Sequence, residues 1–305
     1  MRVAEPSAAA ELQLEQYATT LDNTGRWGPD DEAGTLNFLT SDVVRNAASL
    51  IRTGDRVGCA RPVGLVAGAA PGRGVLHWMT KSGADNSPAG SGTATDWVGL
   101  PLHGTEYTHL DGHAHCFWNG RMYNGRSMLA VTTNRGALQG GLEPTFPGIA
   151  GRGILFDAVA VNAGERLAPG MAIEASDLNE FFRRVNLTPA SGDVLFVRTG
   201  NKRTHERDGL PGLDISCLQW LYDSQTSVLL SDAVSDVFPG VHKHMDEPIH
   251  TVSLALMGLW MIDNAALDDL AAQCEAVKRY EFFTVISTIP FRRATGTLVN
   301  PIAIF

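Results

Sequence analysis

The chain has 305 residues, of which 44% are hydrophobic and 19% are charged, enough to bury the core of one large domain or two ordinary ones. The formal net charge of −9 and the lack of a basic run argue against nucleic-acid binding, because phosphate contacts need clustered Lys and Arg. No apolar run reaches about 18 residues and no basic segment precedes an apolar one at the N-terminus, so we expect neither a membrane span nor export.

The N-terminal part of the chain predicts two helices and a long loop. Residues 8–23 are rich in helix-forming residues, and a second helix is expected over 42–52 with Thr40 or Ser41 as its N-cap. The stretch 64–96 is rich in Gly, Ala and Ser and has no strong period. We interpret it as a loop that shapes a substrate site, because long loops in compact enzymes often do so.

The rest of the chain mixes strands and helices without an internal repeat or a linker of biased composition. Period and flanking glycines predict strands over 97–102, 151–157, 192–200, 228–232, 259–263 and 282–287, and helices over 171–185 (with Ser176 as a possible cap), 215–222 and 248–257. We therefore predict one α/β domain over 61–305, with residues 1–60 as an arm packed on it.

The cysteines indicate a reducing compartment. Cys59, Cys116, Cys217 and Cys274 are dispersed and form no Cys-x-x-Cys pair. This pattern favours a cytoplasmic protein over a disulfide scaffold or a zinc ribbon. Cys116 stands next to a histidine, but a small buried residue is a simpler interpretation than a nucleophile.

Histidines are concentrated in two windows of the sequence. Four of the nine fall within thirteen residues and three more follow in a second window: His103, His109, His113 and His115, then His242, His244 and His250. The isolated His77 and His205 receive no role. A lone histidine is usually a hydrogen-bonded structural residue, so the clustering is what points to chemistry.

The segment His109-x-Asp111-x-x-x-His115 has the spacing of a metal site. On a strand, His109 and Asp111 would point to the same face, and a turn through Gly112 would bring His115 to the same point. Mixed imidazole and carboxylate ligands with room for water predict a catalytic divalent ion. His113 would share the face of Asp111 only if the strand continued through Gly112. The remaining histidine of this window, at position 103, either shapes the loop or touches substrate.

Several segments resemble the metal-dependent cyclase family that includes bacterial kynurenine formamidase and isatin hydrolase. They follow the family's order over about residues 25–290, and the chain is similar to its longer members. These segments are Arg26–Asn37, Thr108–Trp118, Gly120–Gly125, Gly192–Gly200 and Leu230–Asp232. The resemblance implies a swivelling β/β/α fold and hydrolysis of an amide, lactam or ester bond, usually with zinc or manganese.

The resemblance also implies a ligand set. His109, Asp111 and His115 match the metal ligands of the family's motif, and His250 occupies the position of a later family histidine. Asp263 falls where the family usually has a glutamate, and is one methylene shorter. If His250 and Asp263 join His115 around a second ion, the site is binuclear.

The general base is left open by two departures from the family. Gly112-His113 replaces the small or proline residues of many members, and Trp118-Asn119 stands where some members carry a base histidine. The candidates for the base are Asp263, His250 and His113, in falling order. The aromatic residues Trp97, Phe117, Trp118 and Tyr123 form either a substrate wall or part of the core.

The function expected from these residues is hydrolysis by a metal-activated water of a small-molecule substrate, a cyclic or N-acyl amide or a lactone. A lyase or true cyclase acting through a metal-stabilised enolate needs the same ligands, so it stays open. A non-catalytic binding protein with a structural metal is the third interpretation. We also expect a homo-oligomer, dimer or tetramer, because family members commonly associate and apolar stretches such as 64–76 need cover.

Overall fold

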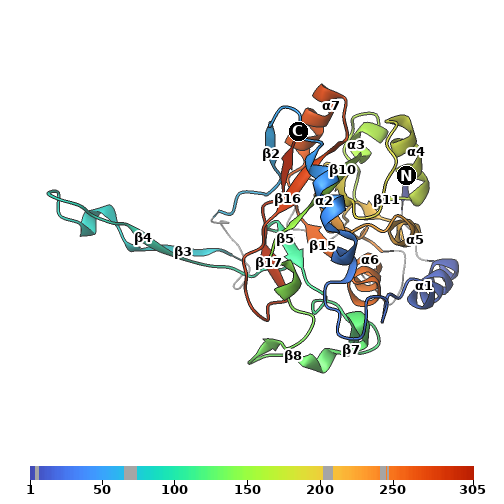
Figure 1. The fold of residues 1–305 in the computed structure, drawn as a ribbon, viewed down its shortest axis with the longest axis horizontal. Helices are drawn as coiled ribbons and strands as arrows, with labels where there is room; N and C mark the ends of the chain where they lie inside the picture. Colours follow the sequence, from blue (N-terminus) through green and yellow to red (C-terminus); the bar gives the residue numbers. More distant parts are fainter. Residues whose placement is uncertain (4–6, 65–73, 202–208, 241–244, 246) are drawn as a thin grey trace.

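A computed structural model of the chain describes residues 1–3, 7–64, 74–201, 209–240, 245 and 247–305 (Figure 1). His205, His242 and His244 lie outside these residues, as does most of the predicted apolar stretch 64–76. Within the described residues, no helix is both long and apolar enough to cross a membrane.

A curled nine-stranded sheet forms the centre of the described structure. From one edge to the other, its strands are β17 (Gly296–Leu298), β5 (His109–Asp111), β15 (Trp260–Asp263), β14 (Val228–Ser231), β12 (Val194–Arg198), β10 (Ile149–Asp157), β16 (Glu281–Ile286), β18 (Ile302–Ile304) and β2 (Arg56–Gly58). Strands β15, β14, β12 and β10 are parallel, and the strands outside them pair antiparallel. The predicted α/β class is confirmed, and the five strands predicted between 151 and 287 are present. The three-residue strands β2, β17 and β18 were not predicted, because so short a segment carries no period.

Side chains from the central strands are buried on both faces of the sheet. In β12, Val194 and Phe196 enter one core while Leu195 and Val197 enter the other. Strands covered on both faces read as continuous apolar runs, which is why this strand was recognisable in the sequence. One core is completed by α1 (Ala8–Thr20), α4 (Ala175–Arg184), α5 (Ser216–Asp223) and α6 (Pro248–Val252), on the right in Figure 1, and the other by α7 (Asp268–Val277).

The predicted helix over 171–185 is wrong in its first part. Met171–Ile173 forms strand β11, which pairs with β1 (Arg2–Val3) and β13 (Gly212–Leu213), and α4 begins only after it. The cap is Glu174, which forms a reciprocal capping box with Asp177, rather than Ser176. By contrast, the predicted cap Thr40 of α2 (Ser41–Ala48) is confirmed, since its hydroxyl accepts the N–H of Val43.

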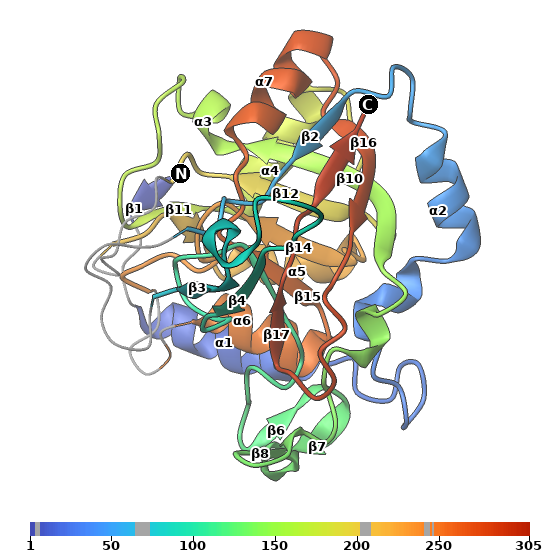
Figure 2. The ribbon, with the colours of Figure 1, turned by 90° about the vertical axis from the view of Figure 1, so that its left-hand side faces the viewer.

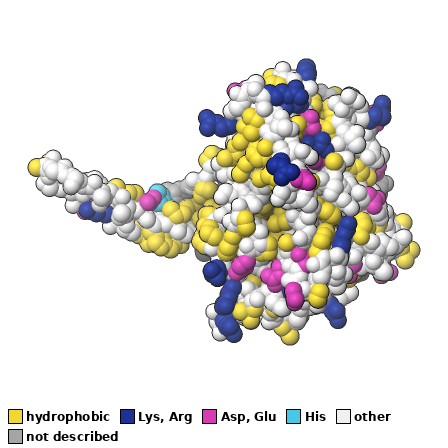
Figure 3. Space-filling view, in the orientation of Figure 1, with side chains coloured by type: hydrophobic (Ala, Val, Ile, Leu, Met, Phe, Trp, Pro, Cys, Tyr) yellow, Lys and Arg dark blue, Asp and Glu magenta, His cyan; other side chains and the backbone are white. Residues whose placement is uncertain are grey.

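The predicted loop over 64–96 is also wrong in part. Leu76–Lys81 (β3) and Thr95–Gly99 (β4) pair as a two-stranded ribbon that extends away from the rest of the molecule (Figures 1 and 3). Both faces of the ribbon are exposed, so its sequence shows no clean alternation of apolar and polar residues. The predicted strand over 97–102 is therefore β4 of this ribbon, and the strand that carries the histidine motif starts at His109.

The N-terminal residues are attached to the sheet and to the segment that follows α6. Strand β2 pairs with β18. Asn23 binds the carbonyls of Leu256 and Met257, at 3.0 and 2.8 Å, and the N–H of Thr35 binds that of Gly258 at 2.9 Å. These carbonyls belong to the π-helical turn η6 (Ser253–Met257) and the residue after it. The division into an arm of 60 residues and a core stays a prediction.

Candidate metal centre

Strand β5 brings the histidine motif into the sheet beside β15. The register places Asp263 opposite His109 and Met261 opposite Asp111. Because alternate residues of a strand share a face, His109 and Asp111 point to one side while Leu110 enters the core. His115 returns through the predicted turn, with its N–H on the carbonyl of Gly112 at 2.9 Å.

The five predicted ligand residues lie together. Asp111 Oδ1 is 3.5 Å from His109 Nε2 and 4.0 Å from His115 Nε2, and its Oδ2 is 3.8 Å from His250 Nε2. Asp263 Oδ2 is 3.0 Å from the same His250 nitrogen. Among the described residues, two trios have ligand atoms close enough to hold an ion, and Asp111 belongs to both: His103, His109 and Asp111, and Asp111, His250 and Asp263.

The hydrogen bonds of two histidines determine which nitrogen faces the cluster. His109 donates its Nδ1 proton to the carbonyl of Tyr107 at 2.8 Å, and His250 donates its Nδ1 proton to Asp236 at 2.6 Å. A ring nitrogen committed in this way leaves Nε2 as the one that can bind an ion.

His103, whose role the sequence left open, also belongs to the cluster. Its Nδ1 lies 2.6 Å from Asp111 Oδ1 and its Nε2 lies 2.9 Å from Thr295 Oγ1. The ring stacks on His115 with centroids 3.8 Å apart. Position 296 must be glycine for this arrangement, because a Cβ there would lie 2.5 Å from the His103 ring. A loop six residues before His109 thus returns to Asp111, which no period or spacing in the sequence indicates.

His113, the third candidate base, is not brought together with the other site residues. Its ring packs against Tyr123 and Trp260, and its Nε2 donates to the carbonyl of Gly258 at 3.0 Å. Burial lowers the pKa of His113 to about 4, so the ring is neutral at pH 7. This environment is that of a core histidine.

Burial and charge set the protonation states of the cluster. Burial raises the pKa of Asp111, but His109, His103 and His115 outweigh it and hold that pKa below its usual range. Burial lowers the pKa of His115 to about 4. Burial also lowers the pKa of His250, but Asp263 and Asp236 outweigh this effect and hold it well above its usual value.

The donor atoms fit a divalent ion. Among the residues that the structure describes, Asp111 Oδ2 has no hydrogen-bond partner although it is buried. Ligand atoms about 2.1 Å from a tetrahedral ion are about 3.4 Å apart. The distances of 3.5, 3.8 and 4.0 Å between Asp111 oxygens and imidazole nitrogens are close to that value. A carboxylate with an unused buried oxygen, close to several imidazoles, is a donor set that suits a divalent metal ion.

Asp263 is not a helix cap. The helix that follows it, α7, starts at Asp268 with Leu267 as its N-cap residue. The Asp263 carboxylate instead accepts the hydroxyl proton of Ser235 at 3.1 Å and lies against His250. The contacts of Asp263 are therefore with the cluster and not with the start of α7.

Three other residues singled out in the sequence lie away from the cluster's chemistry. Burial raises the pKa of the Cys116 thiol to about 12, so it is not a thiolate at neutral pH. Tyr123 is buried and donates its hydroxyl proton to Asp31 at 2.8 Å, and Trp97 lies on the ribbon. These two aromatic residues do not form a wall with Phe117 and Trp118.

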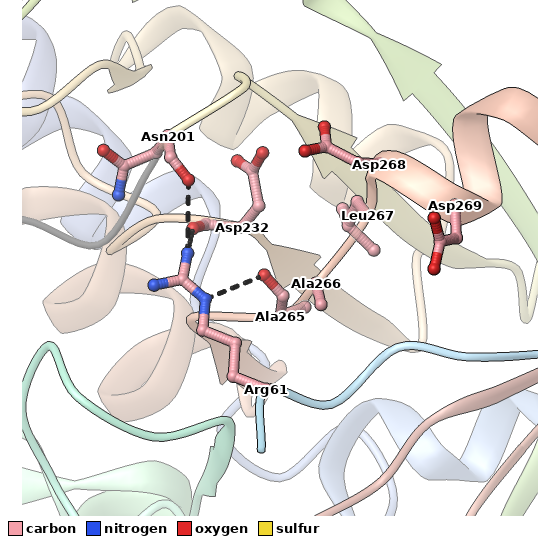
Figure 4. Close-up of a pocket in the computed structure, with 8 residues that line it drawn as sticks. All are labelled: Arg61, Asn201, Asp232, Ala265, Ala266, Leu267, Asp268 and Asp269. Atoms are coloured by element: carbon pink, nitrogen blue, oxygen red, sulfur yellow. Dashed lines mark hydrogen bonds between the residues drawn. The ribbon is translucent and has the colours of Figure 1, made fainter. Parts of the chain in front are cut away.

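A cavity of about 330 Å³ lies next to the ends of β12 and β14 (Figure 4). The Arg61 guanidinium crosses it and donates to the carbonyls of Asn201, Asp232 and Ala265. The Asp232 carboxylate accepts protons from Thr199 and Gly200. None of the clustered histidines is among the described residues that line this cavity, so it is distinct from the metal centre.

Comparisons with known proteins match the chain and its fold. A model of the cyclase family matches residues 70–236, more than half of the chain. The crystal structure of a novel cyclase superposes with a TM-score of 0.83 at 27% identity, over 94% of this chain and 100% of that one.

Two isatin hydrolases share the fold at lower similarity. An isatin hydrolase bound to the product analogue thioisatinate gives a TM-score of 0.59 at 14% identity, over 88% and 96% of the two chains. Isatin hydrolase A from Labrenzia aggregata, bound to benzyl benzoate, gives 0.57 at 14%, over 89% and 100%. No curated protein sequence matches the chain. The predicted cyclase-like fold is confirmed.

Proposed function

Because the chain belongs to the cyclase family, we propose that it is a metal-dependent hydrolase that cleaves an amide, lactam or ester bond. The observation that carries this proposal is the buried carboxylate of Asp111. Its Oδ2 has no hydrogen-bond partner among the described residues, and its two oxygens lie 3.5 to 4.0 Å from imidazole nitrogens of three histidines. A divalent ion, when bound there, supplies a hydroxide at neutral pH and polarises the substrate carbonyl.

The protein's own residues have separate tasks in this proposal. His109, Asp111 and His115 hold the ion, and His103 orients Asp111 through the 2.6 Å contact with its Oδ1. Asp263 is the first candidate for the base, because its buried carboxylate belongs to the cluster, with Oδ2 3.0 Å from His250 Nε2. Proton transfer of this kind contributes about 10²–10⁴-fold to a rate. If a second ion binds, His250 and Asp263 become ligands together with Asp111.

The finer parts of the proposal are the ion, the substrate class and the assembly. The ion is Zn²⁺ or Mn²⁺, the substrate is a cyclic or N-acyl amide, and the protein is a cytoplasmic homo-oligomer. Isatin hydrolases with this fold support the inclusion of lactams among the substrates to be tested.

The experiment measures metal content by elemental analysis and turnover on a panel of formamides, lactams and lactones. Asp111→Ala and His109→Ala should lose metal and activity together, whereas His77→Ala, at a histidine exposed on the ribbon, should lose neither. Full metal occupancy in Asp111→Ala contradicts the proposal. Reaction in ¹⁸O water separates hydrolysis from a lyase or cyclase reaction, because only hydrolysis places ¹⁸O in the product.

A further inference from the structure

We propose that the consecutive residues Ser235 and Asp236 are positioning residues that hold His250 and Asp263 in their ligand-binding orientation. The inference rests on the proposed metal-dependent function. Neither residue has a ligand atom in the two trios, and both are buried, at 1% exposure each.

Asp236 determines which nitrogen of His250 is free. Its carboxylate accepts three protons: the backbone N–H of Ile249 at 2.7 Å, the backbone N–H of His250 at 3.1 Å, and the Nδ1 proton of the His250 ring at 2.6 Å. The backbone bonds fix the start of α6 relative to the carboxylate, and the ring bond fixes the imidazole. His250 Nε2 consequently points toward Asp111 and Asp263, and Nδ1 cannot bind an ion.

Ser235 determines which oxygen of the Asp263 carboxylate faces the cluster. Its hydroxyl donates to Asp263 Oδ1 at 3.1 Å, so that Oδ2 of the same carboxylate faces His250. Two neighbouring side chains thus orient the two members of one ligand pair, each through an oxygen or nitrogen that the pair does not use for the ion.

The backbone of this dipeptide is fixed from outside the nine-stranded sheet. The Ser235 carbonyl accepts the N–H of Leu213 at 2.8 Å, and Asp236 forms a parallel bridge with the same residue of β13. A Cβ on Gly212 would lie 2.3 Å from the Asp236 carbonyl carbon, so glycine is required for this close approach. A backbone held this closely transmits little movement to the side chains it carries.

The test compares metal affinities rather than turnover. Asp236→Asn keeps the size of the side chain, but its one acceptor oxygen cannot accept all three protons, and its NH₂ group must face either the Ile249 N–H or the two N–H groups of His250. Loss of an outer partner of a metal-binding histidine typically costs about 10–100-fold in metal affinity. We expect a loss in this range for Zn²⁺, measured by chelator competition, and about tenfold for Ser235→Ala, which leaves the α6 contacts intact.

The tautomer of His250 provides a second readout that a general loss of stability does not change. In the Zn²⁺-loaded wild type, ¹⁵N spectra should show His250 protonated at Nδ1, and metal-free Asp236→Asn near pH 8 should show the proton at Nε2. The control is Asp157→Asn, which removes a similarly buried carboxylate that caps α3 (Ala158–Val161) and should lower stability without changing Zn²⁺ affinity.

Three outcomes overturn the inference. Wild-type Zn²⁺ affinity in both Asp236→Asn and Ser235→Ala overturns it while leaving the proposed function intact. An equal loss of affinity in the Asp157→Asn control also overturns it, because the effect is then one of stability. A wild-type protein that binds neither Zn²⁺ nor Mn²⁺ overturns the proposed function as well.

Discussion

At the scale of single residues, Asp263 is the first candidate for the base in the proposed reaction. It is 3% exposed, accepts a proton from Ser235 and lies 3.0 Å from His250. Removing its charge while keeping its size should therefore affect chemistry more than folding. We expect Asp263→Asn to lower kcat by about 10² or more, because a general base or a ligand is lost.

The same variant should leave the melting temperature nearly unchanged, since no helix depends on Asp263 for its cap. Asp268→Asn is the matched control: it alters the first turn of α7 and the ion pair with Arg198 and should leave turnover at the wild-type value. Turnover of Asp263→Asn near the wild-type rate would show that this carboxylate takes no part in the reaction.

His113 leads to the opposite expectation. Its Nε2 bond to Gly258 satisfies a buried carbonyl, and leaving a buried polar group without its partner costs about 1–3 kcal/mol. His113→Leu should therefore lower the free energy of unfolding by about this amount, measured in urea, while the folded enzyme keeps its kcat and metal content. A selective loss of kcat in a stably folded variant would restore His113 as a base.

The sequence contained the part of the site that follows from local geometry. His109 and Asp111 were predictable because a strand repeats every two residues, and His115 because Gly112 allows a turn. The contacts of His103 with Asp111 and of Asp236 with His250 depend on how the chain returns to bring together residues that are 8 and 14 positions apart. No period or spacing in one sequence specifies such a return.

At the scale of elements, the two residues that follow β12, Thr199 and Gly200, donate hydrogen bonds to the Asp232 carboxylate. Burial raises the pKa of Asp232 to about 6, although Thr199 and Gly200 donate to its carboxylate. Because the folded pKa lies above the unfolded value of about 3.9, stability from this group is present below pH 4 and is lost as the pH rises through 6.

The measurement compares the free energy of unfolding of the wild type with that of Asp232→Asn, so that the pH dependence due to the other carboxylates cancels. A chelator keeps metal out of both proteins. Between pH 4 and pH 7, the free energy of unfolding of the wild type should fall relative to the variant by up to about 3 kcal/mol, from about 1.4 kcal/mol per pKa unit. A difference that stays constant with pH would show that the Asp232 carboxylate keeps its ordinary pKa.

Element boundaries were predictable where burial is two-sided or a cap is strong, as in β12 and α2. They were not predictable where tertiary pairing overrides local preference. Met171–Ile173 is recruited as a strand by β1 and β13. The ribbon is held by a cross-strand stack of Trp78 on Trp97, with ring centroids 4.3 Å apart, a contact that requires the two strands to be brought together first.

At the scale of the whole molecule, the exposed ribbon supports the expectation of a homo-oligomer. Trp78 is 49% exposed and Trp97 is 43% exposed, beside the exposed Leu76, Met79 and Val98 (Figure 3). A lone two-stranded ribbon is marginally stable in water, and exposed apolar patches mark interaction surfaces. Light scattering at micromolar concentration should therefore give at least twice the mass of one chain, 32.7 kDa.

Replacing both ribbon tryptophans with Ser should shift the mass toward that of one chain. The control is Leu12→Ser, since Leu12 is 68% exposed on α1 and far from the ribbon in Figure 1. A wild-type protein that is monomeric at this concentration would contradict the expectation.

Further elements project from the molecule at its lower end, where β6 (Arg121–Met122), β7 (Arg126–Ser127) and β8 (Val131–Thr132) lie together (Figure 2).

The bonds from Asn23 and Thr35 to the carbonyls around η6 have a consequence for shortened forms of the protein. Those carbonyls lie on the stretch that joins the helix of His250 to the strand of Asp263. The N-terminal segment therefore holds that stretch in place through hydrogen bonds. A protease that removed the first forty residues would leave every ligand in place in the sequence, yet the distance between two of them would no longer be enforced. Such a shortened protein should lose its bound metal under conditions in which it is still folded.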